Sequence, residues 1–201
     1  MHRLSRFMPF ACAVLMAVVL SACSVRLVSD YDAEIDRGLT QFNTDLTAFV
    51  NKMIAVSNTP AGTYSSNQDF YIAQDAKLST LVVRAEAHKV LNSCPSTQVI
   101  KKALQSVTPP SSSGTAPLPI PMPDPAQVAA QIGENDCSVV LLNLIRTGLD
   151  QMRQFHMMQN QKGIPAAAHD PLLVGGIGSL VRAALTVEIA KKTGGSVAGA
   201  S

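Results

Sequence analysis

Four side chains in the last third of the chain could do soft-metal chemistry: Met152, His156, Met157 and Met158. Thioether and imidazole groups suit Cu(I), and Met152 and His156 are spaced one helical turn apart, so the two could share an ion. The interpretation we favour places Met152 in an apolar helix seam, with His156 at the end of that seam. We therefore predict no metal site and no cofactor.

The remaining polar residues do not form a catalytic pattern. His88 follows Glu86 by two residues and His169 directly precedes Asp170, spacings that do not place an acid and a base on one helical face. The stretch 175–178 is rich in glycine, but no strand is predicted before it, so it does not indicate a nucleotide loop. We interpret each acidic residue as surface charge or as a complement to a helix end. The sequence therefore predicts no catalytic residue and no enzyme.

The first 22 residues have the composition of an export signal. Arg3 and Arg6 precede an apolar run over 8–20, which is short for a permanent membrane helix of about 20 apolar residues. The tetrapeptide Leu20-Ser21-Ala22-Cys23 that follows resembles the lipobox of bacterial lipoproteins. This resemblance implies cleavage between Ala22 and Cys23 and a lipid on Cys23, whose acyl chains hold the protein on a membrane. A conventional signal peptide and an uncleaved signal anchor are the alternatives.

The residue after the lipobox concerns the choice of membrane. In lipoproteins of the kind that this chain resembles, Asp at that place favours the inner membrane, and this chain has Ser24. The resemblance therefore implies the outer membrane, with the body of the protein in the periplasm. Without residues 1–22 the chain keeps 14 basic and 14 acidic residues, and a neutral body has no electrostatic footprint for nucleic acid. The expected partners are the membrane, through the lipid, and another envelope protein.

Four cysteines occur, and the resemblance accounts for two of them. Cys12 leaves with the signal peptide and Cys23 carries the lipid, so Cys94 and Cys137 remain. Because two leftover cysteines in an oxidising compartment usually pair, we predict a disulfide between them. Two buried thiols are the alternative, and a zinc site is disfavoured because neither cysteine has a neighbouring ligand at the usual spacing.

Helices are predicted to position all of these residues, within a domain over 29–194 that follows a tether over 23–28. Ser29 and Asp32 have the spacing of a capping box. Apolar residues then recur every three or four positions and form a seam along one helix face, until the stretch 58–62 ends the helix. Its members are Tyr31, Ile35, Leu39, Phe42, Leu46, Phe49, Met53 and Val56.

The middle of the chain predicts two helices and a long connection. The first covers 68–92, with an apolar stripe of Leu78, Leu81, Val82 and Ala85, and the second covers 96–107. Seven prolines between 109 and 125 predict an extended spacer or surface loop, because proline cannot donate to a helix or sheet ladder. A site for a partner domain on this stretch is the alternative.

The last third predicts a short helix over 126–134 and two longer ones. One covers 136–162 with a seam of Leu141, Ile145, Leu149, Met152 and His156, and the other begins at Asp170-Pro171 and ends at Lys192. Small residues at 175, 179 and 183 would let another backbone approach the last helix. The tail 195–201 is predicted to be disordered. The fold class is all-α, a bundle of about four to five helices with a Pro-rich connection and one disulfide.

Two function classes remain. The first, which we favour, is a structural or protein-interaction module displayed in the periplasm. The second is a helical carrier or sensor that holds an apolar small molecule between helices, because bundles can open ligand cavities.

Overall fold

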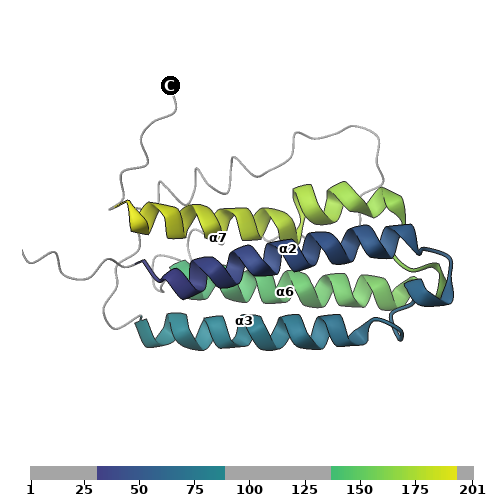
Figure 1. Ribbon diagram of the computed structural model, residues 1–201, viewed down its shortest axis with the longest axis horizontal. Helices are drawn as coiled ribbons and strands as arrows, with labels where there is room; N and C mark the ends of the chain where they lie inside the picture. Colours follow the sequence, from purple (N-terminus) through teal and green to yellow (C-terminus); the bar gives the residue numbers. More distant parts are fainter. Residues whose placement is uncertain (1–30, 89–136, 194–201) are drawn as a thin grey trace, which may run out of the picture.

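The computed structural model describes residues 31–88 and 137–193, which form an all-α bundle of four long helices (Figure 1). No strand occurs in these two ranges. Several predicted segments lie outside the described residues: the signal peptide 1–22, the tether 23–28, the helix 96–107, the Pro-rich stretch 109–125, the helix 126–134 and the tail 195–201.

Helix α2 (Ala33–Ala55) begins where Asp32 caps it. The Asp32 carboxylate accepts the backbone N–H of Glu34 at 2.8 Å and that of Ile35 at 3.4 Å, two donors that have no partner within the helix. The predicted capping box with Ser29 as the cap is therefore wrong, because Asp32 is itself extended and outside the helix. The predicted seam is confirmed at six positions, all buried: Ile35, Leu39, Phe42, Leu46, Phe49 and Met53.

Helix α3 (Gln68–His88) starts at the predicted residue. The Asn67 side chain organises the turn before it by donating to the carbonyls of Ala61 at 2.7 Å and Thr63 at 2.8 Å. All four members of the predicted stripe are buried: Leu78, Leu81, Val82 and Ala85. The end of the predicted helix, 89–92, lies outside the described residues.

Helix α6 (Cys137–Met158) ends before the predicted Lys162. A short 3-10 turn, Asn160–Lys162, follows it. Asn160 has a positive φ of 50°, a left-handed conformation that Asn tolerates but that an α-helix cannot contain. The predicted seam from Leu141 to His156 is confirmed, and each of its members is buried.

The last predicted helix is not continuous. A π-helical turn, Pro171–Gly175, precedes α7 (Ile177–Lys192), and Gly176 separates the two. A Cβ atom on Gly178 would lie 2.0 Å from the carbonyl oxygen of Leu173, so the glycines permit a close backbone approach inside this break. Arg182 spans it by donating to the carbonyls of Leu173 at 2.8 Å and Val174 at 2.5 Å. The prediction of one helix over 170–192 is corrected in this respect.

The four long helices close a ring in the order α2, α3, α6, α7, and neighbours in the ring run in opposite directions (Figure 1). One end of the bundle carries the connections 56–67 and 159–176, and we call it the loop end. At the other end, which we call the open end, lie the first residues of α2 and α6 and the last residues of α3 and α7.

One hydrophobic cluster fills the space between the helices and draws residues from all four. Among the described residues, one stretch, Ala166–Lys192, is long and apolar enough to cross a membrane, yet 67% of its most apolar window is buried inside the bundle. A core helix of a globular protein has the same character.

Candidate functional site

His156, the centre of the predicted soft-ligand group, is fully buried near the loop end. Its Nε2 atom lies 2.8 Å from the carbonyl oxygen of Gly62, and its Nδ1 atom lies 2.9 Å from the hydroxyl of Tyr71. A carbonyl only accepts, so Nε2 carries the proton and Nδ1 accepts from Tyr71. Burial lowers the pKa of His156, although the hydrogen bond to Gly62 raises it in part. The imidazole is thus a neutral connector between helices.

Aromatic rings surround this connector. Phe49 and Phe70 stack with centroids 3.7 Å apart, and Tyr71 meets Phe49 edge to face at 5.4 Å. The Tyr64 ring meets His156 edge to face at 6.0 Å. Burial raises the pKa of Tyr71, so its hydroxyl stays protonated and keeps donating.

The structure separates the four residues of the predicted soft-ligand group. Met152 is buried in the core, whereas Met157 is 49% and Met158 64% exposed. Both ring nitrogens of His156 are held by protein groups, so no lone pair is available for a metal. In the described ranges, no group of three or more His, Cys, Asp and Glu side chains could hold an ion.

The two exposed methionines border a groove of about 760 Å³ at the loop end, which we call the loop-end groove. Residues from the α2–α3 connection form one wall, and the last two residues of α6 with the turn that follows them form the other. The groove is lined by Thr63, Tyr64, Ser65, Met157, Met158, Gln159, Asn160, Gln161 and Lys162. Thioethers adapt to many surfaces and tyrosine combines an apolar ring with a hydroxyl, a composition typical of protein contact surfaces.

Contacts between the two connections hold the walls of this groove in place. The backbone N–H of Asn58 donates to the carbonyl of Lys162 at 2.9 Å. Gly163 adopts a φ of 65°, and a Cβ atom there would lie 2.5 Å from the carbonyl oxygen of Gly62. With the His156 hydrogen bond to Gly62, these contacts make the groove a fixed surface rather than two independent loops.

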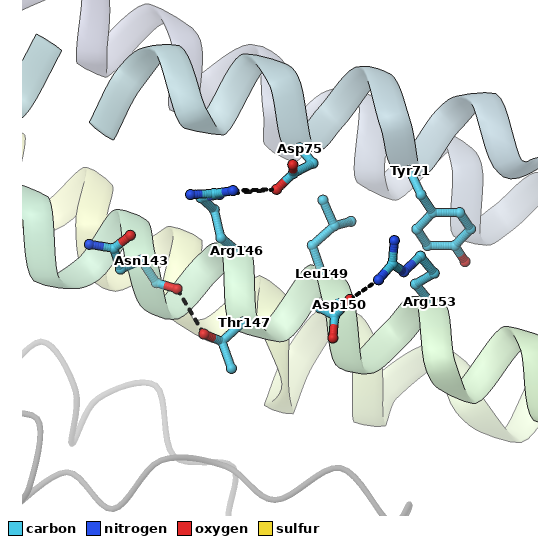
Figure 2. A pocket seen from close by; sticks show the side chains of 8 residues that line it. All are labelled: Tyr71, Asp75, Asn143, Arg146, Thr147, Leu149, Asp150 and Arg153. Atoms are coloured by element: carbon cyan, nitrogen blue, oxygen red, sulfur yellow. Dashed lines mark hydrogen bonds and ion pairs between the residues drawn. The ribbon is translucent and has the colours of Figure 1, made fainter. Parts of the chain in front are cut away.

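A second groove, of about 450 Å³, lies between α3 and α6 (Figure 2). Arg146 pairs with Asp75 across it at 3.0 Å, and Arg153 pairs with Asp150 on the same helix. Tyr71 and Leu149 line it further along. Because each of the two guanidinium groups already faces a carboxylate, this groove offers less free charge to a ligand than its composition suggests.

The sequence did not indicate a third feature, a polar cluster buried at the open end. The Ser138 hydroxyl donates to Glu188 at 2.5 Å and accepts from Lys191 at 2.6 Å, while Lys191 and Glu188 pair at 3.2 Å. Burial raises the pKa of Glu188, and Lys191 and Ser138 oppose that rise. The Glu188 and Lys191 side chains are 1% and 3% exposed, so the interpretation of every acidic residue as surface charge or helix-end complement is wrong for Glu188.

Asp32 extends this polar end to α3. Its carboxylate pairs with Arg84 at 2.5 Å and lies 3.1 Å from the His88 ring. Burial raises the pKa of Asp32, but the hydrogen bonds from Arg84 and from the Glu34 N–H outweigh it, and the pKa is lowered. One signal in the sequence could have indicated the buried pair: Glu188 and Lys191 are spaced three residues apart inside an otherwise apolar helix.

The remaining predicted sites are distributed as follows. His169 lies on the surface with its Nδ1 atom 2.7 Å from the Asp170 carboxylate, so this histidine and this acid do meet, although their spacing did not predict it. Cys137 is buried in the first turn of α6, and Cys94 lies outside the described residues, so the disulfide stays a prediction. Ala22 and Cys23, with the cleavage and lipid sites, also lie outside the described ranges.

No protein-family model, no curated protein and no solved structure matches this chain.

Proposed function

We propose that this chain is a lipid-anchored lipoprotein of the outer membrane, facing the periplasm, that acts as a structural or protein-interaction module rather than as an enzyme. The anchor is supported by the tetrapeptide Leu20-Ser21-Ala22-Cys23 behind a charged and apolar leader. The module is supported by a closed bundle whose exposed methionines and Tyr64 lie on a fixed groove.

The observation that carries the proposal is the exposure of Met157 and Met158 beside loops that are tied together. If the apolar groups lay on a flexible loop, the loop would have to become ordered when a partner binds, and this ordering would reduce the binding free energy. Here the Asn58 and His156 hydrogen bonds already order both walls. An exposed apolar surface on a pre-organised scaffold is characteristic of a contact site for another protein.

The packing of the core favours this module over a carrier of an apolar small molecule. A side chain that faced a cavity of ligand size would keep accessible surface. The residues that would line such a cavity keep none: Leu46, Val50, Met53, Leu141, Leu142, Ile145 and Met152 are each 0% exposed.

The position of the groove fits a tethered module. Tyr31 lies at the open end, because it directly precedes the cap of α2 and its ring faces Lys192 at the end of α7. In the sequence the short stretch 24–30 joins it to Cys23. The 23 residues of α2 then span about 34 Å at 1.5 Å per residue. An anchor at Cys23 would therefore hold the open end near the membrane and present the loop-end groove to the periplasm.

Two measurements test the anchor and the contact site separately. Intact-mass analysis of the mature protein should show a diacylated Cys23, and Cys23→Ser should leave the membrane fraction; firm membrane retention of Cys23→Ser would contradict the anchor. Photo-crosslinking amino acids placed at Met158 and, as a control of similar exposure, at Ile189 should capture an envelope protein from the first position only. Equal capture from both positions, or from neither, would contradict the groove as the contact site.

A further inference from the structure

The outer face of α3 carries a second, mostly apolar stripe, on the side opposite the buried residues Leu78, Leu81, Val82 and Ala85. Its members recur at steps of four, four, three and four residues, and all are exposed: Ile72, Ala76, Thr80, Val83 and Ala87. Ile72 is 62% and Val83 66% exposed. Regular spacing of this kind is the signature of a helix face that packs against another helix.

Charged residues of opposite sign flank this stripe. Lys77 and Arg84 lie on the side toward α2, where they pair with Asp45 and Asp32. On the other flank, toward α6, lie Glu86 and Asp75, of which Asp75 pairs with Arg146. The outer face is thus an apolar line with a basic edge and an acidic edge.

The ion pairs within the bundle do not remove the charge of these edges. In each pair, the more exposed side chain is the one that carries the charge of its edge. Lys77 is 52% exposed against 25% for Asp45, and Arg84 is 44% exposed against 5% for Asp32. On the acidic edge Asp75 is 53% exposed against 35% for Arg146. A partner that approaches α3 therefore meets cations along one edge and carboxylates along the other.

We propose that a second copy of this chain covers this face, with the two α3 helices side by side and parallel about a two-fold axis. In a parallel pair each basic edge faces the partner's acidic edge, as at the flanking positions of a parallel coiled coil. In an antiparallel pair like edges would face each other and repel. The charge pattern therefore selects both the partner and its orientation.

The parallel arrangement places both open ends on the same side. Two copies that are anchored in one membrane could therefore form it without inverting either copy, and the dimer expected on membranes rests in this respect on the proposed lipid anchor at Cys23. A single helix face is a small interface, so the dimer is expected to be weak in dilute solution and to form where tethering raises the local concentration. Asp69, one turn before Ile72, would repel its counterpart, so the helices should cross nearer Val83.

Oxidative crosslinking of full-length single-cysteine additions tests the contact in cell membranes. Val83→Cys should crosslink to its own copy about tenfold more than the parent chain or Ala48→Cys, an exposed site on α2, the difference expected for a contact favoured by about 1.4 kcal/mol. No crosslink above the parent would overturn the proposal. Crosslinking only in a mixture of Val83→Cys with Ala76→Cys chains would overturn the parallel arrangement, since those two positions meet in an antiparallel pair.

A charge placed in the stripe distinguishes between two occupants of this face, a second copy of the chain and another segment of the same chain. With a lysine-reactive crosslinker on membranes, Val83→Glu should lower the dimer fraction by about tenfold, and Ile189→Glu, a 54% exposed site on α7, should not. Both variants should unfold at similar temperatures. If Val83→Glu unfolded at a much lower temperature than Ile189→Glu, the face would be covered within one chain, and the proposal would be wrong.

Discussion

The Tyr71 hydroxyl donates to Nδ1 of the buried His156 over 2.9 Å, and this contact joins α3 to α6 across 85 positions of sequence. Tyr71→Phe would remove the only donor that the described residues offer to that nitrogen. A buried acceptor without its partner costs about 1–3 kcal/mol, so urea unfolding should show a loss of that size. Tyr64→Phe, a half-buried ring on the same cluster, is the control and should lose less. Equal losses would show that the hydrogen bond is not the cause.

His156 should also make stability depend on pH. Burial lowers its pKa below the usual value of 6.5, so the unfolded chain takes up a proton before the folded protein does. The stability that it contributes is present above 6.5 and is lost as the pH falls through the lowered pKa. The free energy of unfolding should therefore fall below about pH 6.5, and His156→Gln should reduce that slope. An unchanged slope in the variant would assign the dependence to other groups.

The Glu188–Lys191 pair should behave as a buried pair. Lys191→Met leaves the Glu188 carboxylate buried without its cation, which typically costs about 3–5 kcal/mol. The double variant Glu188→Met with Lys191→Met should recover much of that loss, because no isolated charge remains. Arg37→Met tests an exposed pair of the same spacing, Glu34 with Arg37, and should change stability little. A double-mutant cycle measures the coupling, and additive losses would contradict it.

Two glycines should respond differently to alanine. A Cβ atom on Gly178 meets the backbone oxygen of Leu173 at 2.0 Å, whereas one on Gly38 meets the side chain of Leu81 at 2.8 Å. Backbone cannot yield there without opening the π-helical turn, but a leucine side chain can rotate. Thermal unfolding should show Gly178→Ala strongly destabilised, by more than about 2 kcal/mol, and Gly38→Ala only mildly, since alanine also favours the helix. The reverse order would contradict the interpretation.

The Cys94–Cys137 disulfide should contribute to stability through the long loop that it closes. The chain-entropy model gives about 4 kcal/mol for a loop of this size. In the denatured protein, the two cysteines should not react with an alkylating reagent until a reductant is added. The reduced protein should unfold at a lower denaturant concentration. Two free thiols in the native protein would end this prediction.

The helices were predictable because their seams are local. Ile35 to Met53 on α2 and Leu141 to His156 on α6 repeat every three or four residues, and such a repeat has only one helical face to occupy. The interruption before α7 was not, because Gly175-Gly176-Ile177-Gly178 permits both a continuous helix and a broken one. The carbonyl of Leu173 and the guanidinium of Arg182 decide between them, and that contact exists only after the turn has formed.

By itself, the sequence determined the all-α class and the seams, since both are encoded in neighbouring residues. The export address, read from neighbouring residues in the same way, stays a prediction. Tertiary structure alone decided which polar groups are buried. The sequence around Glu188 does not show that its carboxylate is buried against Ser138 of α6. Likewise, His156 connects two parts of the bundle only because the fold places Tyr71 and Gly62, which are distant in sequence, beside its ring. The physical reason is that a polar group is tolerated in the core only when it has hydrogen-bond partners. Here those partners come from elements distant in sequence, and the hydrophobic periodicity of one helix does not encode them.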